Sequence, residues 1–142
     1  DGSIQIIGDI STYIHEIGYS GLAMLRNPFH DCIFEEGIKM VAMKKADASE
    51  IKKLMRRYMK EGMPRNYGMF ECGIIVAEND NPMGHDILEQ WYREYMTHKL
   101  RDQLSLPYIL WKNGLPLRTI GIIDGGRDTR NSNIARRVRS HN

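Results

Sequence analysis

The chain has few cysteines and no long apolar run. Only Cys32 and Cys72 occur among its 142 residues, and they belong to no C-x-x-C pair. Two such distant cysteines do not indicate a disulfide framework or a zinc site, so we interpret both as buried thiols. No apolar stretch approaches the roughly 20 residues of a membrane-spanning helix, and no signal-like N-terminus is present. The sequence therefore predicts no membrane segment in this chain.

A large excess of one charge is also missing. The 20 Lys and Arg residues face 18 Asp and Glu residues, for a formal net charge of +2. This balance gives no reason to expect a nucleic acid or an anionic membrane as partner. The basic residues do gather near the end, at Arg127, Arg130, Arg136, Arg137 and Arg139. That group is either a contact for a phosphate-bearing partner or a solvated tail, and nucleic-acid binding through it would weaken steeply with salt.

The common nucleotide and zinc-protease motifs are absent. The sequence contains no G-x-G-x-x-G, no G-x-x-x-x-G-K-[ST] and no H-E-x-x-H, so dinucleotide, P-loop and zincin functions have no motif to support them. His30-Asp31-Cys32 has the composition of a nucleophilic triad. Because neighbours in sequence rarely form such a triad, a Cys–His hydrolase is not favoured.

The length and the order of elements predict a single α/β domain. A chain of 142 residues can bury a real core without disulfides. Apolar spacing and turn residues predict strands at 3–7, 21–25, 69–77 and 117–123, and helices after Asp9, at 32–45, from Asp47 to about 60, at 83–99 and at 101–112. Asp9 and Asp47 are expected to begin their helices, and Gly62 to close the helix that Asp47 begins. The helix after Asp9 is expected to bury an apolar stripe formed by Ile10, Tyr13, Ile14 and Ile17. Pro107 is expected to kink or split the last helix. We place the domain at 1–126 and a basic C-terminal segment at 127–142.

Three polar residues open the otherwise apolar segment 101–112. Asp102 can cap the first backbone N–H groups of a helix, and Gln103 can both donate and accept hydrogen bonds. Arg101 carries a guanidinium fork that suits a carboxylate or a phosphate. From the residues alone, a helix cap and a polar substrate site are about equally good interpretations of Asp102.

Several other acidic and histidine residues are candidates for chemistry. Glu71 interrupts an apolar strand, and a buried carboxylate needs a cation, a donor or a ligand, so it is either functional or structurally paired. The pair Glu35-Glu36 is interpreted as part solvated helix face and part partner of a nearby Arg. Asp1 precedes a strand and can bind a hard cation through oxygen, although a simple turn is the ordinary alternative. His141 is either a metal ligand or a tail residue.

Taken in order, these pieces resemble the TOD/MUCI-type glycosyltransferase-like domain, found in plant Golgi proteins and in bacterial and viral polysaccharide loci. That family was long catalogued as a domain of unknown function. The resemblance covers nearly the entire chain, and its longest part is the segment 101–112. The matching segments are Asp1–Ile4, Arg26–Glu36, Glu61–Pro64, Glu71–Ile75, Asn79–Asp80, Trp91 and Arg101–Lys112.

The resemblance implies a GT-A-like mixed sheet flanked by helices and a nucleotide-sugar-dependent glycosyltransferase. Such an enzyme moves a sugar from a nucleoside-diphosphate sugar to a glycan acceptor in polysaccharide or glycoconjugate biosynthesis. The resemblance also implies a divalent metal, Mn²⁺ or Mg²⁺, held by Asp1 with His141 completing the site. A hard cation of this kind bridges carboxylate and diphosphate oxygens and neutralises the leaving group.

The same resemblance implies roles for individual residues. Asp102, Gln103 and Arg101 are implied to be catalytic or sugar-orienting. The residues implied to bind substrate are Glu71, Cys72, Gly73, Arg26 and His30. Family members often have Arg where His30 stands, so the charge contact at that position differs here.

The chain also departs from the family pattern at its start. Members of the family usually have an aromatic residue before the Asp-Gly pair and, further upstream, the elements that bind the nucleotide base. We therefore expect a nucleotide-binding portion to precede Asp1 in the natural protein. The alternative function is a non-catalytic glycan-binding or scaffolding remnant of the same fold. The expected location is the cytoplasm for a bacterial or viral protein and the Golgi lumen for a full-length plant-type protein.

Overall fold

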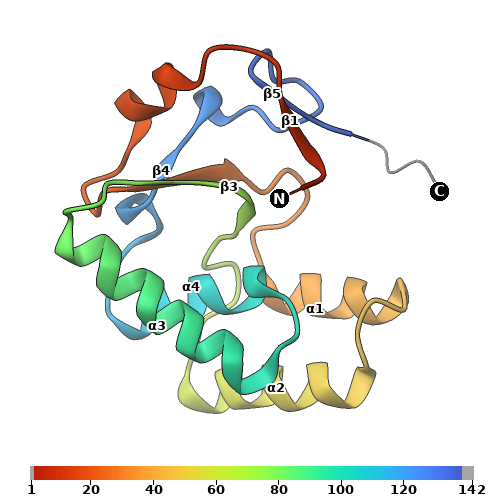
Figure 1. Cartoon of the computed structure of the whole chain (residues 1–142). Helices are drawn as coiled ribbons and strands as arrows, with labels where there is room; N and C mark the ends of the chain where they lie inside the picture. The colour runs from red at the N-terminus through yellow and green to blue at the C-terminus, as the bar shows by residue number, and fades with distance from the viewer. Residues whose placement is uncertain (1, 139–142) are drawn as a thin grey trace. The chain divides into compact units, whose positions relative to one another are not determined.

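The computed structural model describes residues 2–138, which form two compact units (Figure 1). The first, which we call the strand unit, contains residues up to 28 together with 70–85 and the residues from 118 onward. The second, the helical unit, contains residues 29–69 and 86–117. Both helices and sheets of mixed strands are present, so the predicted α/β class is confirmed.

A three-stranded sheet forms the core of the strand unit. Its order is β3 (Phe70–Ala77), β2 (Leu22–Arg26) and β4 (Gly121–Ile122), with β2 antiparallel to β3 and parallel to β4. The four residues from Leu22 to Leu25 are fully buried. A continuous apolar run is what a central strand covered on both faces requires, and the predicted strands at 21–25 and 69–77 are confirmed.

A second, two-stranded sheet joins the two ends of the described chain. β1 (Ile4–Ile6) runs antiparallel to β5 (Ala135–Arg137), with Ile4 opposite Arg137. The predicted strand at 3–7 is confirmed. β5 was not predicted, because the sequence after residue 126 is polar and poorly periodic and its strand depends on pairing with a distant segment.

The predicted helix after Asp9 is a 3-10 helix, η1 (Ile10–Glu16). Asp9 caps it as expected, since its carboxylate accepts a hydrogen bond from the backbone N–H of Ser11 at 2.9 Å. The apolar stripe predicted for an α-helix is wrong, however, because only Tyr13 is buried while Ile10 and Ile14 are exposed. A 3-10 helix has three residues per turn, so residues spaced for an α-helix leave its buried side.

The predicted strand at 117–123 is mostly irregular. Leu117–Thr119 forms the 3-10 helix η2, β4 has only two residues, and Asp124–Gly126 forms η3. A Cβ atom added to Gly121 would lie 1.8 Å from the carbonyl oxygen of Glu16, so the two backbones cross closely at that point. The Glu16 carboxylate then accepts the N–H groups of Asp124 and Gly125 at 2.6 and 2.8 Å. This contact ends the strand and anchors η3.

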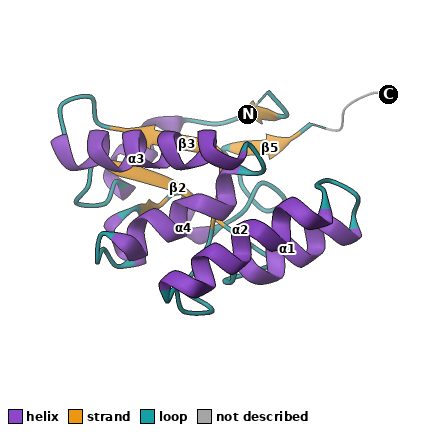
Figure 2. Cartoon of the chain, turned by 90° about the horizontal axis from the view of Figure 1, so that it is seen from below, coloured by secondary structure: helices purple, strands orange, loops and turns teal. Residues whose placement is uncertain are grey.

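Four helices make up most of the helical unit: α1 (Ile33–Ala42), α2 (Ala48–Glu61), α3 (Pro82–His98, from residue 86 on) and α4 (Asp102–Lys112). Figure 2 shows α1 and α2 side by side, and Gly37 allows their close approach because an added Cβ would lie 3.2 Å from Ile51. The predicted caps of α2 are confirmed: Asp47 accepts two N–H groups, and Gly62 adopts a left-handed φ of 97°.

α4 is a single helix, so the prediction that Pro107 splits it is wrong, while a kink at Pro107 stays a prediction. Every residue from Leu104 to Leu110 is buried, including Pro107 itself. A proline inside a helix costs about 3 kcal/mol, whereas each large buried apolar side chain contributes roughly 1.5–3 kcal/mol. Several such side chains surround Pro107, and together they outweigh the lost hydrogen bond.

The two cysteines differ in burial. Cys32 is buried at the N-terminus of α1, but Cys72 on β3 is only half-buried, so the prediction of two buried thiols is right for Cys32 alone. Neither thiol forms a disulfide within the described residues. Among the helices that the structure describes, none is both long enough and apolar enough to cross a membrane.

Candidate active site

The helical unit buries one acidic side chain among its described residues, Glu36 on α1, which is 4% exposed. It lies on the same face of the helix as Ile33, Gly37 and Met40, which are also buried. Its neighbour Glu35 points toward solvent. Of the two neighbouring carboxylates, Glu35 therefore belongs to the solvated face of the helix, and Glu36 is the one with cationic partners.

Three cationic or potentially cationic side chains surround Glu36. The Nη1 atom of Arg101 donates to Oε1 of Glu36 at 3.4 Å. On the other carboxylate oxygen, Nε2 of His30 lies 3.7 Å away and Nζ of Lys39 lies 4.0 Å away. The second ring nitrogen of His30 faces Glu35 at 3.6 Å. We call these residues the Glu36 cluster, and it brings together two residues predicted from sequence, Arg101 and His30.

The predicted polar trio stands at the start of the buried helix α4. Arg101 is the N-cap residue and makes no side-chain cap, while Asp102 is the first helical residue. Its Oδ1 accepts the backbone N–H of Gln103 at 2.9 Å, and its carbonyl oxygen accepts the indole N–H of Trp91 at 2.9 Å. Asp102 is therefore the first residue of the helix, one position after the N-cap, and its carboxylate contacts the backbone of that helix. The hydrogen bond from Trp91 fixes its own backbone.

The cluster can bind an oxyanion. Arg101 has five N–H donors, and its side chain is 41% exposed while it contacts Glu36 through Nη1. Lys39 is 37% exposed, and its ammonium group lies 4.6 Å from the centre of the Phe29 ring. Exposed cations held by a buried carboxylate beside Asp102 form a surface that suits phosphate or carboxylate groups.

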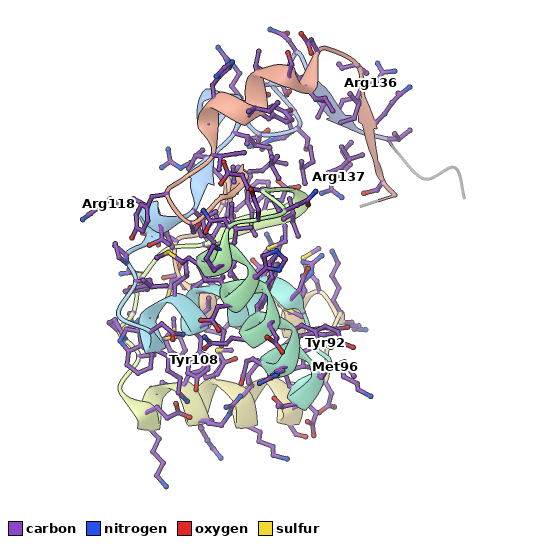
Figure 3. All side chains as sticks on the ribbon, turned by 60° about the vertical axis from the view of Figure 1, so that its left-hand side comes forward. Tyr92, Met96, Tyr108, Arg118, Arg136 and Arg137 are labelled. Carbon is purple, nitrogen blue, oxygen red and sulfur yellow. The ribbon has the colours of Figure 1, made fainter. Side chains whose placement is uncertain are left out.

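The remaining predicted substrate residues lie in the strand unit. Glu71 on β3 is mostly buried, and its Oε1 accepts Nη2 of Arg137 at 2.6 Å. Arg137, labelled next to β3 in Figure 3, also donates to the Ser3 hydroxyl at 2.8 Å. An ionic partner for Glu71 therefore comes from the basic segment at 127–142, which agrees with the structural interpretation of this carboxylate. Its contact with a substrate stays a prediction.

Cys72 and Gly73 lie in an irregularity of β3. Leu25 of β2 pairs with Glu71 and Met24 pairs with Ile75, so three residues of β3 are inserted between adjacent pairs. Bulges of this kind are common beside active sites, where they change the direction of a side chain. A Cβ on Gly73 would lie 2.5 Å from Cδ1 of Ile4, so packing of β1 also explains this glycine.

The remaining predicted residues, Arg26, Asp1 and His141, do not belong to the Glu36 cluster. Arg26 ends β2 in the strand unit, opposite Phe70, and is exposed. Asp1 and His141, the predicted metal ligands, lie outside the described residues. Within residues 2–138, no group of three or more His, Cys, Asp or Glu side chains is arranged to hold a metal ion. The metal site therefore stays a prediction.

Sequence reasoning did not select Glu36 as a site residue. A usable signal was present, because Glu36 falls three residues after Ile33 and four before Met40, on the apolar stripe of its helix. A carboxylate on such a stripe is buried when the helix packs, and a buried carboxylate needs a partner. The partner, Arg101, is 65 residues away in sequence.

A second polar cluster in the same unit centres on Glu94 of α3. Its Oε1 accepts the Tyr58 hydroxyl at 2.9 Å, and its carboxylate pairs with Arg57 of α2. Tyr58 stacks on Tyr108 of α4, with ring centres 3.9 Å apart. Burial, with Glu94 nearby, raises the pKa of Tyr58 well above its ordinary value. We call this the Glu94 cluster, and it connects α2, α3 and α4.

The Glu94 cluster continues to the surface through Tyr108, labelled in Figure 3. Its hydroxyl donates to Oε2 of Glu61 at 2.6 Å and accepts a hydrogen bond from Nζ of Lys112 at 2.8 Å. The hydrogen bond from Tyr108 lowers the pKa of Glu61. A pocket of about 330 Å³ lies beside the cluster, lined by Glu50, Lys53, Leu54, Arg57, Thr97 and His98. No residue predicted for the site lines this pocket.

Comparison with known proteins gives one match. The family model of the TOD1/MUCI70, glycosyltransferase-like domain matches residues 10–120, most of the chain. That span contains the Glu36 cluster, Asp102, Gln103 and Glu71, while Asp1 and His141 lie outside it. Neither the curated proteins nor the solved structures searched include a match. The resemblance inferred from the sequence is confirmed, and with it a general glycan-related function. The chain belongs to the TOD1/MUCI70 family of glycosyltransferase-like domains.

Proposed function

We propose that the chain is the catalytic part of a metal-dependent transferase that moves a sugar from a nucleoside-diphosphate sugar to a glycan acceptor. Its place would be in polysaccharide or glycoconjugate biosynthesis. The observation that carries the proposal is the position of Asp102 beside the Glu36 cluster, inside the region that matches a glycosyltransferase-like family. A carboxylate and an exposed guanidinium at the start of one buried helix suit a reaction that separates charge.

The proposed roles follow from that separation of charge. Glycosyl transfer builds positive charge on the sugar ring and negative charge on the departing diphosphate. Asp102 would face the sugar, as a catalytic or orienting carboxylate, and Arg101 would face the diphosphate. Gln103, the next residue on the helix, would hydrogen-bond sugar hydroxyl groups, because its amide both donates and accepts.

The divalent metal belongs to the proposal as well. Mn²⁺ or Mg²⁺, bound through Asp1 and His141, would supply further neutralisation of the diphosphate. Because these two residues lie outside the described part of the chain, the support for the metal is the resemblance alone.

The experiment is a thermal-shift titration with Mn²⁺ and a panel of nucleotide sugars, followed by a transfer assay with the donor that stabilises the protein. A folded protein that responds to no donor would contradict the proposal. Asp102→Asn should then abolish transfer and leave the fold intact. Asp86→Asn is the matched control, since Asp86 is an exposed aspartate of the same unit that contacts Gln90. Full activity of Asp102→Asn would reject the catalytic role of Asp102.

Glycan-array binding, with and without Mn²⁺ and a nucleotide, tests the alternative function. A non-catalytic glycan-binding or scaffolding domain would bind glycans on an array without metal or nucleotide. Strict dependence of glycan binding on Mn²⁺ and a nucleotide would count against that alternative.

A further inference from the structure

Glu36 is buried deeply but its cationic partners are not close. Arg101, His30 and Lys39 lie at 3.4, 3.7 and 4.0 Å from its oxygens. Charge-assisted hydrogen bonds between nitrogen and a carboxylate are usually about 2.7–2.9 Å long. A buried carboxylate is costly, and contacts of this length offset little of that cost. This geometry points to a role other than stability.

We propose that Glu36 is a positioning residue that holds Arg101 at the start of α4 so that its remaining N–H groups bind an oxyanion. The oxyanion is the diphosphate of the sugar donor, an assignment that rests on the proposed function. His30 and Lys39, held by the same carboxylate, place further donors around Arg101.

The contact between Arg101 and Glu36 leaves the guanidinium available. Arg101 touches the carboxylate through Nη1 and keeps an exposed side chain, so its other nitrogens can form the two parallel hydrogen bonds that a phosphate prefers. Free arginine side chains lose rotamer entropy when they become ordered. An arginine that is already held at one nitrogen has less of that entropy left to lose on binding.

The charges also favour an approaching anion. Glu36 is buried behind its cationic partners, whereas Arg101 and Lys39 are about two-fifths exposed. An anion in contact with the guanidinium is therefore nearer to the positive charges than to the Glu36 carboxylate. Because Coulomb energy falls with distance, attraction exceeds repulsion at that point.

The same chemistry could come from two ligands, a phosphate group or the carboxylate of an acidic sugar. Inorganic pyrophosphate and glucuronate are therefore the two probes. Each is titrated at constant ionic strength into the full ¹⁵N-labelled chain, and the side-chain Nε–H signal of Arg101 is followed by NMR. We expect pyrophosphate to shift this signal and glucuronate to have a much smaller effect.

The decisive variant is Glu36→Val. If Glu36 only neutralises Arg101, removing its negative charge should tighten pyrophosphate binding. If Glu36 positions Arg101, binding should weaken about tenfold although the site has become more positive. Glu36→Gln keeps an acceptor for Nη1, so it should retain most of the affinity. This second variant keeps the test valid if the valine variant folds poorly.

Glu94→Gln is the matched control, because it alters another carboxylate–arginine pair of the unit with a similarly shielded carboxylate and should leave pyrophosphate affinity unchanged. Unchanged or tighter binding by Glu36→Val would overturn the inference, even if the protein transfers sugars. Weaker binding by that variant would support it, even if no transfer is detected. A response to glucuronate but not to pyrophosphate would overturn the diphosphate assignment.

Discussion

Two glutamates of the helical unit, Glu94 and Glu36, have side chains that are at most about a tenth exposed and each faces an arginine, yet the two pairs are built differently. Glu94 accepts a hydrogen bond from the fully buried Tyr58 at 2.9 Å, and its arginine, Arg57, lies over the Tyr58 ring at 5.0 Å. Glu36 is itself more deeply buried, but Arg101 is at 3.4 Å and is exposed on its other side. The carboxylate with a short hydrogen bond from an interior tyrosine joins helices, while the one whose partners are all longer contacts to cations leaves donors for the proposed ligand.

The comparison separates stability from function within one compact unit. The Glu94 cluster joins α2, α3 and α4 through two stacked tyrosines and their hydrogen bonds. The Glu36 cluster joins α1 to the first residues of α4, where Asp102 stands. α4 therefore carries a stabilising contact in its middle and the proposed binding surface at its start. Changes at the two glutamates should affect different properties of the protein.

The largest expected effect on stability comes from Glu94→Ala. The variant leaves the buried hydroxyl of Tyr58 without its acceptor and Arg57 without its main partner. An unsatisfied buried donor costs about 1–3 kcal/mol, so we expect a loss of about 2–3 kcal/mol in the free energy of unfolding. Urea denaturation measures this change.

The matched control for this prediction is Glu89→Ala on the same helix. Glu89 forms an exposed pair with Arg93 one turn away, and such pairs contribute about 0.2–0.5 kcal/mol. Equal losses for the two variants would show that the Glu94 cluster contributes no more than a surface ion pair. The contrast between the two glutamates of the unit would then disappear.

Local signals in the sequence predicted much of the framework around both clusters. Asp47 and Gly62 bound α2 as expected, because a cap depends on the residue type and on backbone groups a few positions away. The polar start of α4 was predicted for the same reason. The sequence also resembled a family that the comparison confirms, since that resemblance uses the order of many short segments.

The features that could not be predicted all depend on distant residues. Glu36 needs Arg101 to become part of a site, and β5 needs β1 to become a strand. Pro107 remains inside a helix because the residues around it are buried by neighbouring elements. Tertiary packing decides each of these outcomes, and a single sequence carries no direct record of which residues meet.

A smaller effect is expected from His98, which stands near Glu94. Its Nδ1 accepts the N–H of Leu100 at 3.0 Å, so the neutral ring carries its proton on Nε2, which is buried without a partner among the described residues. Burial lowers the pKa of His98 below its ordinary value of 6.5, although Glu94 opposes this shift. Protonation would also place a hydrogen on Nδ1, facing the Leu100 donor.

The sign of the pH effect follows from this lowered pKa. Above pH 6.5 the ring is neutral in both the folded and the unfolded chain. As the pH falls below that value, the unfolded chain takes up a proton before the folded chain does, so stability decreases until the folded pKa is passed. His98→Asn keeps an acceptor for Leu100 and should lose less stability between about pH 7 and about pH 5 than the wild type.

Thermal unfolding across this pH range measures the difference. The exposed His85 near the start of the same helix provides the control, and His85→Asn should keep the wild-type slope. A wild-type slope in His98→Asn would contradict the assignment of this pH dependence to His98. Another residue would then be responsible for the pH dependence, and His98 would not be the pH-sensitive group beside the Glu94 cluster.

The smallest effect on stability is expected from Glu36→Gln. The amide keeps an acceptor for Nη1 of Arg101, and it removes a buried charge whose partners are 3.4 to 4.0 Å away. Removal of one partner of an ion pair is costly when the charge that remains is buried, but Arg101 and Lys39 are about two-fifths exposed, so water can solvate them. We therefore expect the free energy of unfolding to change by less than about 1 kcal/mol in urea denaturation. A loss as large as that of Glu94→Ala would show that Glu36 is a structural residue like Glu94.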